Sequence, residues 1–138
     1  MIGYPNGIWD HVHNMPVIRR GITATPVATK WTGKDEFLTD IASFPGSSGS
    51  PVFLANIGGY VDVHGNTNLG THRIKLLGVH YAGAQHTANG SIQIVTAPTS
   101  TLAIPVTSIP DNIGVVINSE RVLNFEPILQ SLNGRVAP

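Results

Sequence analysis

The sequence predicts a single all-β domain, residues 1–138, that ends in one helix, and three observations lead to this prediction. The chain has 138 residues, of which 41% are hydrophobic and 12% charged, so it is long enough to form one packed core. Fifteen glycines and ten prolines separate short apolar segments, which is typical of β barrels and sandwiches. Apolar residues at helical spacing occur at the C-terminal end alone.

Strands are predicted wherever apolar and β-branched residues gather between turn-forming residues. These segments are residues 16–27, 36–42, 52–54, 73–81, 92–95 and 113–117. Turn-rich stretches at 58–59, 64–70 and 83–90 separate some of them. The stretch 96–108 is rich in Thr, Pro and Ser and is expected to be a long surface connection.

The C-terminal segment is predicted to be a helix with Ser119 as its cap and Glu120 in its first turn. Pro127 is expected to kink this helix or delay its start, and Gly134 is expected to end it. The apolar face of the helix comprises Val122, Leu123, Pro127, Ile128, Leu129 and Leu132.

The charge and composition of the chain exclude several classes of partner and cofactor. Eight Lys and Arg residues balance eight Asp and Glu residues, so no net field attracts nucleic acid or an anionic membrane. The absence of cysteine excludes disulfides and thiolate zinc sites, and no apolar run approaches the roughly 20 residues of a membrane helix. No signal peptide is recognisable at the start, so the expected location is the cytoplasm, and no cofactor is expected.

One loop combines the residues that acyl transfer requires. The apolar segment before it leads into Gly46-Ser47-Ser48-Gly49-Ser50, and the strand-like residues Pro51-Val52-Phe53 follow at once. A nucleophilic serine must be exposed, and two backbone N–H groups must converge on the oxyanion that forms. Gly46 allows its own N–H and that of Ser48 to converge, and Gly49 lets the chain leave without filling the cleft.

The composition of this loop also suggests two other interpretations. Gly-Ser-rich composition is common in flexible linkers, but linkers are rarely flanked directly by strand-like residues such as Phe44 and Val52. The nucleophile elbow of α/β-hydrolases has the pattern Gly-x-Ser-x-Gly, but Ser50 stands where its last glycine would be. We therefore favour a serine nucleophile on a β scaffold.

The residues Gly46-Ser47-Ser48-Gly49-Ser50-Pro51 resemble the Gly-Asp-Ser-Gly-Gly-Pro signature of chymotrypsin- and trypsin-like serine proteases. The bacterial trypsin-like peptidases are closer still, because their motif follows Asp-x-x-x-x-Pro, matched by Asp40 and Pro45. The segments 2–8, 20–24, 77–83 and 112–117 resemble further parts of the second barrel of these proteases, in the same order. The resemblance covers nearly the whole chain and implies a six-stranded antiparallel Greek-key barrel with a C-terminal helix.

The resemblance also implies roles for individual residues. Ser48 would attack the scissile carbonyl, and the N–H groups of Gly46 and Ser48 would form the oxyanion hole. Ala42 and Ser43 would lie at the primary specificity pocket, where a small neutral Ala42 suggests an apolar substrate side chain. Ser47 replaces the Asp that pairs with a new N-terminal amine in secreted relatives, so that mode of activation is not expected. The strand that binds substrate would carry His80, Tyr81 and Ala82.

The catalytic His and Asp of the family lie in a first barrel that this sequence lacks. His11 and His13, beside Asp10, precede Ser48 but lie within the second-barrel part, and a polar surface loop explains them better than a metal site. His80 is interpreted as a hydrogen-bonded structural histidine in preference to a catalytic base. The remaining histidines are expected to be solvated in or beside turns: His64, His72 and His86.

Two functions follow as expectations. The first is a serine endopeptidase that acts on polypeptides through an acyl-enzyme, present here as its nucleophile-bearing half and inactive alone because a serine hydroxyl needs a neighbouring base. The second is a non-catalytic, peptide-binding or regulatory barrel of protease-like fold. The expected partners are a polypeptide substrate and the missing N-terminal barrel, and the exposed inter-barrel face favours self-association.

Overall fold

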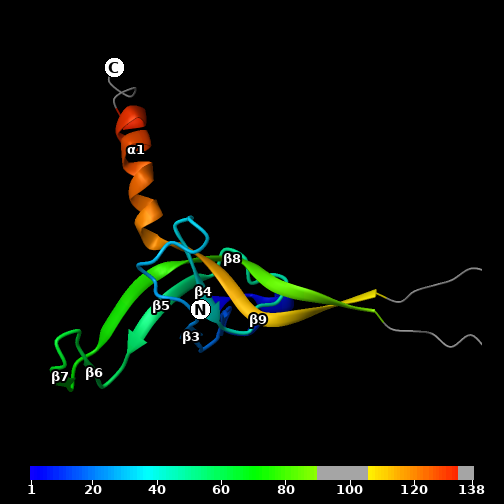
Figure 1. The fold of residues 1–138 in the computed structure, drawn as a ribbon, viewed down its shortest axis with the longest axis horizontal. Helices are drawn as coiled ribbons and strands as arrows, with labels where there is room; N and C mark the ends of the chain where they lie inside the picture. The colour runs from blue at the N-terminus through cyan, green and yellow to red at the C-terminus, as the bar shows by residue number, and fades with distance from the viewer. Residues whose placement is uncertain (90–105, 134–138) are drawn as a thin grey trace, which may run out of the picture.

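The computed structural model describes residues 1–89 and 106–133, and it has a strongly curled, five-stranded antiparallel sheet at its centre (Figure 1). The strand order is β3-β4-β9-β8-β5. The strands are β3 (Ile22–Thr23), β4 (Glu36–Asp40), β9 (Val106–Asn118), β8 (Arg73–Asn89) and β5 (Pro51–Asn56). The expectation of a mostly β protein is confirmed, with the sheet forming a half-barrel.

Two small antiparallel pairs accompany the central sheet. Near the N-terminus, β1 (Ile2–Gly3) pairs with β2 (Val17–Ile18), and the 3₁₀ turn η1 (Pro5–Gly7) follows β1. Farther along, β6 (Gly59–Val61) pairs with β7 (Thr67–Leu69).

A small apolar core lies inside the curl of the sheet. Phe37 of β4 and Val116 of β9 are paired in register and are fully buried. Partly buried apolar residues, Val27 and Leu77, pack against the core. The alternation of buried and less buried residues along β4 is the two-residue period of a strand with one face in the core. The buried apolar residues are Met1, Phe37, Ile41, Val52 and Val116.

The prediction of one continuous strand over residues 16–27 is wrong, because the chain changes partner in the middle of this segment. β2 pairs with β1, whereas β3 pairs with β4. Gly21 lies at the change of direction, where a side chain would collide with the carbonyl oxygen of Asp40 and the side chain of Ile41. This close approach requires glycine and divides the segment into two short strands.

The prediction of a turn over residues 83–90 is also wrong for its described part, since β8 continues to Asn89. Gly83 lies within a strand irregularity, and a Cβ there would lie 2.7 Å from Ser43 Oγ. The glycine thus permits a close contact inside a bulged strand and does not mark a turn. Beyond it, β8 and β9 form a two-stranded arm that extends away from the sheet (Figure 1).

The predicted turn at 64–70 is partly correct. Asp62 Oδ1 accepts hydrogen bonds from the N–H groups of His64 and Asn66, both at 2.9 Å, and these bonds form a tight connection. Residues 67–69 belong instead to β7. The predicted strand at 92–95, residues 96–105 of the predicted connection and the predicted stop at Gly134 lie outside the described residues, whereas residues 106–108 belong to β9.

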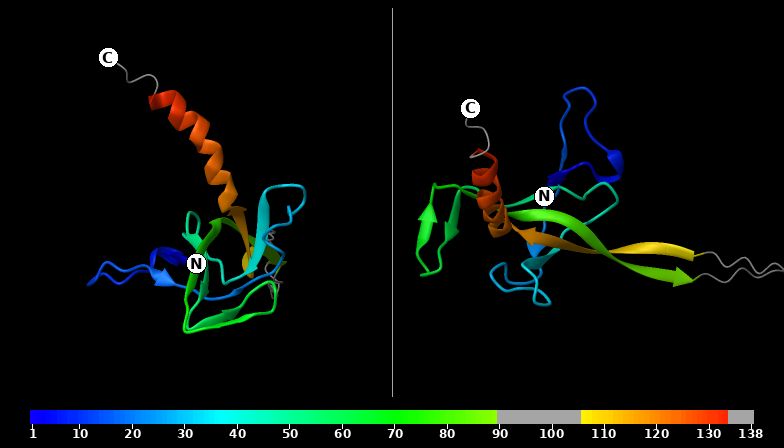
Figure 2. Two further views of the ribbon diagram at one scale, coloured as in Figure 1. Left: turned by 90° about the vertical axis from the view of Figure 1, so that its left-hand side faces the viewer. Right: turned by 90° about the horizontal axis from the view of Figure 1, so that it is seen from above.

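The C-terminal helix begins as the 3₁₀ segment η2 (Ser119–Phe125) and continues as α1 (Glu126–Asn133). Its cap is Asn118 and not Ser119, because Asn118 Oδ1 accepts the N–H of Glu120 at 3.0 Å. Pro127 lies in the first turn of α1, a position that tolerates proline, and the α-helical part starts late, as one of the two expected outcomes. Helix and sheet extend in different directions (Figures 1 and 2).

The apolar side chains of this helix are exposed. They contact no apolar core of the described residues, and no helix in the described part of the chain has the length and hydropathy to cross a membrane. The exposed apolar residues are Val122, Leu123, Phe125, Ile128, Leu129 and Leu132.

Replacing Asn118 by Ala is expected to lower the free energy of unfolding by about 1–2 kcal/mol. The substitution removes the cap and also the 3.0 Å hydrogen bond from Asn118 Nδ2 to the carbonyl of Val27. Urea unfolding checks this expectation. The matched control is Asn124→Ala, an exposed asparagine of η2. Equal stability of the two variants would contradict the role assigned to Asn118.

Candidate functional site

The serine loop, residues 43–50, connects the end of β4 to the start of β5. It opens with a turn in which Ser47 N–H donates to the carbonyl of Phe44 at 3.0 Å. Ser47 is fully buried, and its Oγ accepts the N–H of Phe44 at 3.3 Å. Ser47 stands where the protease motif has Asp. Its buried side chain therefore stabilises this turn.

The second half of the serine loop is bonded to β8. Gly49 N–H donates to the carbonyl of His80 at 2.8 Å, and His80 N–H donates to the carbonyl of Ser50 at 2.9 Å. These two bonds continue the β5–β8 pairing into the loop. Ser48 is exposed, and its Oγ donates to the carbonyl of Tyr81 at 3.0 Å. The hydroxyl is thus held beside β8, one residue beyond His80.

The backbone N–H groups of the serine loop fall into two sets. Those of Ser47, Gly49 and Ser50 all donate to carbonyl oxygens. That of Phe44 donates to Ser47 Oγ. Those of Ser43, Gly46 and Ser48 have no acceptor among the described residues. The pair that the sequence resemblance assigned to the oxyanion hole, Gly46 and Ser48, belongs to this second set. Stabilisation of an oxyanion requires hydrogen-bond donors that have no other acceptor in the protein.

The buried histidine of the site is His80, which has 2% of its surface exposed. Its Nε2 lies 2.8 Å from Oγ of Ser43, which is also buried. The other side of the ring lies against Gly114, where a Cβ would stand 3.0 Å from both Nδ1 and Cε1. Burial lowers the pKa of His80, so the ring is held neutral. It is not hydrogen-bonded to Ser48.

The structure also places the other residues expected to bind substrate. The carbonyl of half-buried Ala42 accepts a hydrogen bond from Arg19 Nη1 at 2.9 Å. Tyr81 is exposed, and its hydroxyl donates to Glu36 at 3.0 Å. Burial and the neighbouring Glu36 raise the pKa of Tyr81. Ala82 follows on β8 and is partly buried.

Two residues that contact the site, Arg19 and Asn6, were not predicted from the sequence. The Arg19 guanidinium lies over the Phe44 ring at 4.7 Å, in addition to its bond to Ala42. Asn6 N–H donates to the carbonyl of Pro45 at 2.6 Å. No local signal identifies Arg19, because its partners are distant in sequence. The Asn6-Gly7 dipeptide does indicate a turn, but not the loop that the turn contacts.

The two N-terminal histidines lie in an exposed hairpin. His13 Nδ1 lies 2.7 Å from Asp10 Oδ2, and this hydrogen bond, with two from the backbone, lowers the pKa of Asp10. The His11 ring stacks beside Trp9 at 4.1 Å between centroids. The described residues contain no group of three or more His, Asp or Glu side chains positioned for a metal ion.

The remaining histidines, His64, His72 and His86, are all exposed, as expected, although His86 lies within β8 and not in a turn. Two of them also make defined contacts. His72 accepts the N–H of Gly58 through Nδ1 at 3.1 Å. His86 Nδ1 contacts a carboxylate oxygen of Asp111 across the β8–β9 arm. None of these histidines hydrogen-bonds Ser48 in the described part of the chain.

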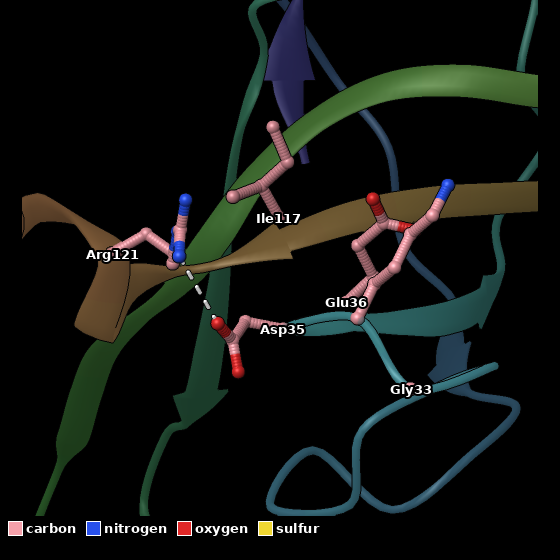
Figure 3. A pocket seen from close by; sticks show the side chains of 6 residues that line it. Gly33, Asp35, Glu36, Ile117 and Arg121 are labelled. Carbon is pink, nitrogen blue, oxygen red and sulfur yellow. Dashed lines mark hydrogen bonds and ion pairs between the residues drawn. The ribbon is translucent and has the colours of Figure 1, made fainter.

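One hollow lies away from the serine loop. It has a volume of about 390 Å³ and lies at the opposite end of β4, beside the start of η2 (Figure 3). Asp35 in its wall pairs with Lys30 and Arg121, and the bond to Lys30 is the main reason why the pKa of Asp35 is lowered. Because its charges neutralise one another and it contains no residue of the serine loop, this hollow is not assigned to catalysis.

Two other hollows lie along the opening of the half-barrel, between β2–β3 and β5. Their volumes are about 220 and 330 Å³. Apolar side chains around the opening, including Ile18, Ile22 and Phe53, are exposed.

No protein-family model, curated protein sequence or solved structure matches this chain. The assignment of the site therefore depends on its own geometry.

The free energy of unfolding is expected to fall as the pH drops below about 6.5. His80 has a lowered pKa in the folded chain and an ordinary value of 6.5 when unfolded, so below this pH the unfolded chain binds more protons. The stability contributed by neutral His80 is complete above the unfolded pKa and is lost as the pH falls toward the folded pKa.

Urea unfolding at about pH 7.5, 6.5 and 5.5 measures how the free energy of unfolding depends on pH. The substitution His80→Gln should reduce this dependence. The control His64→Gln, at an exposed position, should retain it. A slope unchanged in His80→Gln would show that His80 is not the group responsible.

Proposed function

We propose that this chain is the nucleophile-bearing barrel of a serine endopeptidase, with Ser48 as the residue that is acylated. The observation that carries the proposal is the pattern of bonds in the serine loop. Four of its N–H groups, those of Phe44, Ser47, Gly49 and Ser50, are used to hold the loop. Those of Gly46 and Ser48, like that of Ser43, have no acceptor among the described residues. An exposed hydroxyl with two such donors on its own and a nearby residue supports acyl transfer, which needs a nucleophile beside an oxyanion hole.

The backbone of β8 supports a polypeptide as the substrate. On the side away from β9, β8 pairs with β5 as far as Val79 and with the serine loop at His80. Beyond this point, residues 82–87 have no strand on that side in the described chain, and Ser48 lies where the open edge begins. An extended peptide added to this edge would gain backbone hydrogen bonds and bring one carbonyl near Ser48.

We further infer that the half-barrel is part of a closed, six-stranded Greek-key barrel. β1 pairs with β2 and also contacts β5, so the two ends of the curled sheet approach each other through the N-terminal pair. β2 and β3 would then act as two parts of one bent strand. The order β1-(β2/β3)-β4-β9-β8-β5 supports the trypsin-like barrel that the sequence motif suggested.

The mechanism requires a general base from outside this chain. Ser48 Oγ donates to a carbonyl and has no histidine partner in the described residues, and His80 is bonded to Ser43. In the proposed reaction, an upstream barrel supplies the His that removes the hydroxyl proton and the Asp that orients this His. Ser48 Oγ then attacks the peptide carbonyl, the oxyanion is bound by the Gly46 and Ser48 N–H groups, and the amine leaves with the proton.

Peptide binding without cleavage is the second candidate, and the open edge of β8 favours it independently of the hydroxyl. An edge strand can bind a peptide whether or not a base is present. Self-association across the exposed apolar opening is also proposed, because large exposed apolar patches favour association.

The 138-residue chain alone is expected to show no peptidase activity, whereas the product of a longer parent reading frame that carries an upstream His and Asp is expected to cleave peptides. In that longer product, Ser48→Ala should reduce turnover on the order of 10⁶-fold, because the loss of one member disables the whole catalytic set. A peptidase assay with fluorophosphonate labelling measures both effects. The control is Ser131→Ala, which removes an exposed hydroxyl on α1.

Undiminished cleavage by Ser48→Ala would refute the assignment of the nucleophile. A longer product without an upstream His and Asp, and without cleavage, would favour the peptide-binding barrel.

A further inference from the structure

We propose that the turn at residues 4–7 positions the oxyanion hole and that the backbone N–H of Asn6 is the group that does so. This inference rests on the proposed function, since it concerns the same serine loop. The turn is far from the loop in sequence but directly contacts the peptide that joins Pro45 to Gly46.

The first step is the orientation of that peptide. Asn6 N–H donates to the carbonyl oxygen of Pro45 at 2.6 Å, so this carbonyl points toward the turn. In a planar trans peptide the C=O and N–H groups point in opposite directions. The N–H of Gly46 therefore points away from the turn, and it has no acceptor in the described chain. Rotating this peptide by half a turn would break the bond to Asn6 and direct the Gly46 N–H toward the turn.

The second step is the close fit of the turn around Gly46. Gly46 has φ +85°, and a Cβ there would lie 2.6 Å from the carbonyl oxygen of Tyr4 and 3.3 Å from the nitrogen of Asn6. The turn thus encloses the glycine as well as bonding to the peptide before it. Any side chain at position 46 would displace the turn, and so would separate the Asn6 N–H from its acceptor.

The third step is the conformation of Asn6 itself. Its φ of 52° and ψ of 25° are left-handed, a region that Asn tolerates better than most residues other than Gly. The neighbouring N–H groups are used within the turn, because Gly7 donates to Tyr4 and Ile8 donates to Pro5. The N–H of Asn6 is left to face the serine loop.

Residual dipolar couplings of the backbone N–H groups in the 138-residue chain test this inference directly. In the wild type, the Gly46 coupling should fit the described orientation. In Asn6→Pro, which removes the donor and cannot adopt the left-handed φ of Asn6, the Gly46 coupling should no longer fit, whereas those of Gly49 and Ser50 should be unchanged. Asn6→Gly keeps both the N–H and the left-handed conformation and should match the wild type. A Gly46 coupling unchanged in Asn6→Pro would overturn the proposal.

If Asn6→Pro does not fold, Asn6→Val decides the question by the same measurement. Valine keeps the N–H but disfavours the left-handed conformation that aims it. A shift of the Gly46 coupling supports the proposal, and an unchanged coupling overturns it.

The catalytic readout separates positioning from general support of the fold. In a longer product that cleaves peptides, Asn6→Val should lower kcat by about 10²-fold, the cost of one oxyanion donor, with little change in KM. A change confined to KM would overturn the proposal. The couplings need no substrate and no second barrel, so a failure of the proposed peptidase function is distinguishable from a failure of this inference.

Discussion

The candidate site depends on one pair of backbone hydrogen bonds, which join the serine loop to His80. Through these bonds Gly49 and Ser50 become an extension of the β5–β8 pairing, and the loop is fixed to the sheet. Ser48 precedes the first of them, so its hydroxyl is held over the next residue of β8. The buried ring of the same His80 is bonded to Ser43, the first residue of the loop. One residue thus fixes both ends of the loop.

The loop is stabilised from three directions, and each uses donors other than the two that catalysis would need. The buried Ser47 closes the turn from within, β8 holds the second half and the Asn6 turn holds the peptide before Gly46. The positive φ values of Gly46 and Gly49, both +85°, let the backbone enter and leave this arrangement. Backbone donors fixed in advance need little reorganisation when an oxyanion forms.

The sequence predicted what depends on local pattern and missed what depends on contacts between distant segments. The extended segments of β4, β5 and β9 and the C-terminal helix follow from apolar periodicity and turn residues. The division of 16–27 at Gly21 and the continuation of β8 through Gly83 do not, because both glycines are explained by close approach to residues distant in the chain. From the sequence alone, a glycine that forms a turn cannot be distinguished from a glycine that makes room for a neighbouring residue.

The same distinction applies to the site. The motif pointed to Ser48 and to the two N–H groups proposed for the oxyanion hole, because the proposed chemistry constrains neighbouring residues. Arg19 behind Ala42 and Asn6 beside Pro45 could not be identified, since their contacts join residues more than twenty positions apart in the chain. The sequence predicted Ser119 as the helix cap instead of Asn118, because both residue types cap helices well. The register of β9 against β4 decides between the two residues.

Amide hydrogen exchange at single-residue resolution across the serine loop tests the central claim most directly. The account predicts that Gly46 and Ser48 exchange at rates near those of an unstructured peptide. Ser47, Gly49 and Ser50, whose N–H groups are bonded, should exchange at least about tenfold more slowly. Equal rates at all five positions, or protection of Gly46 and Ser48, would contradict a loop that holds these two donors open for an oxyanion.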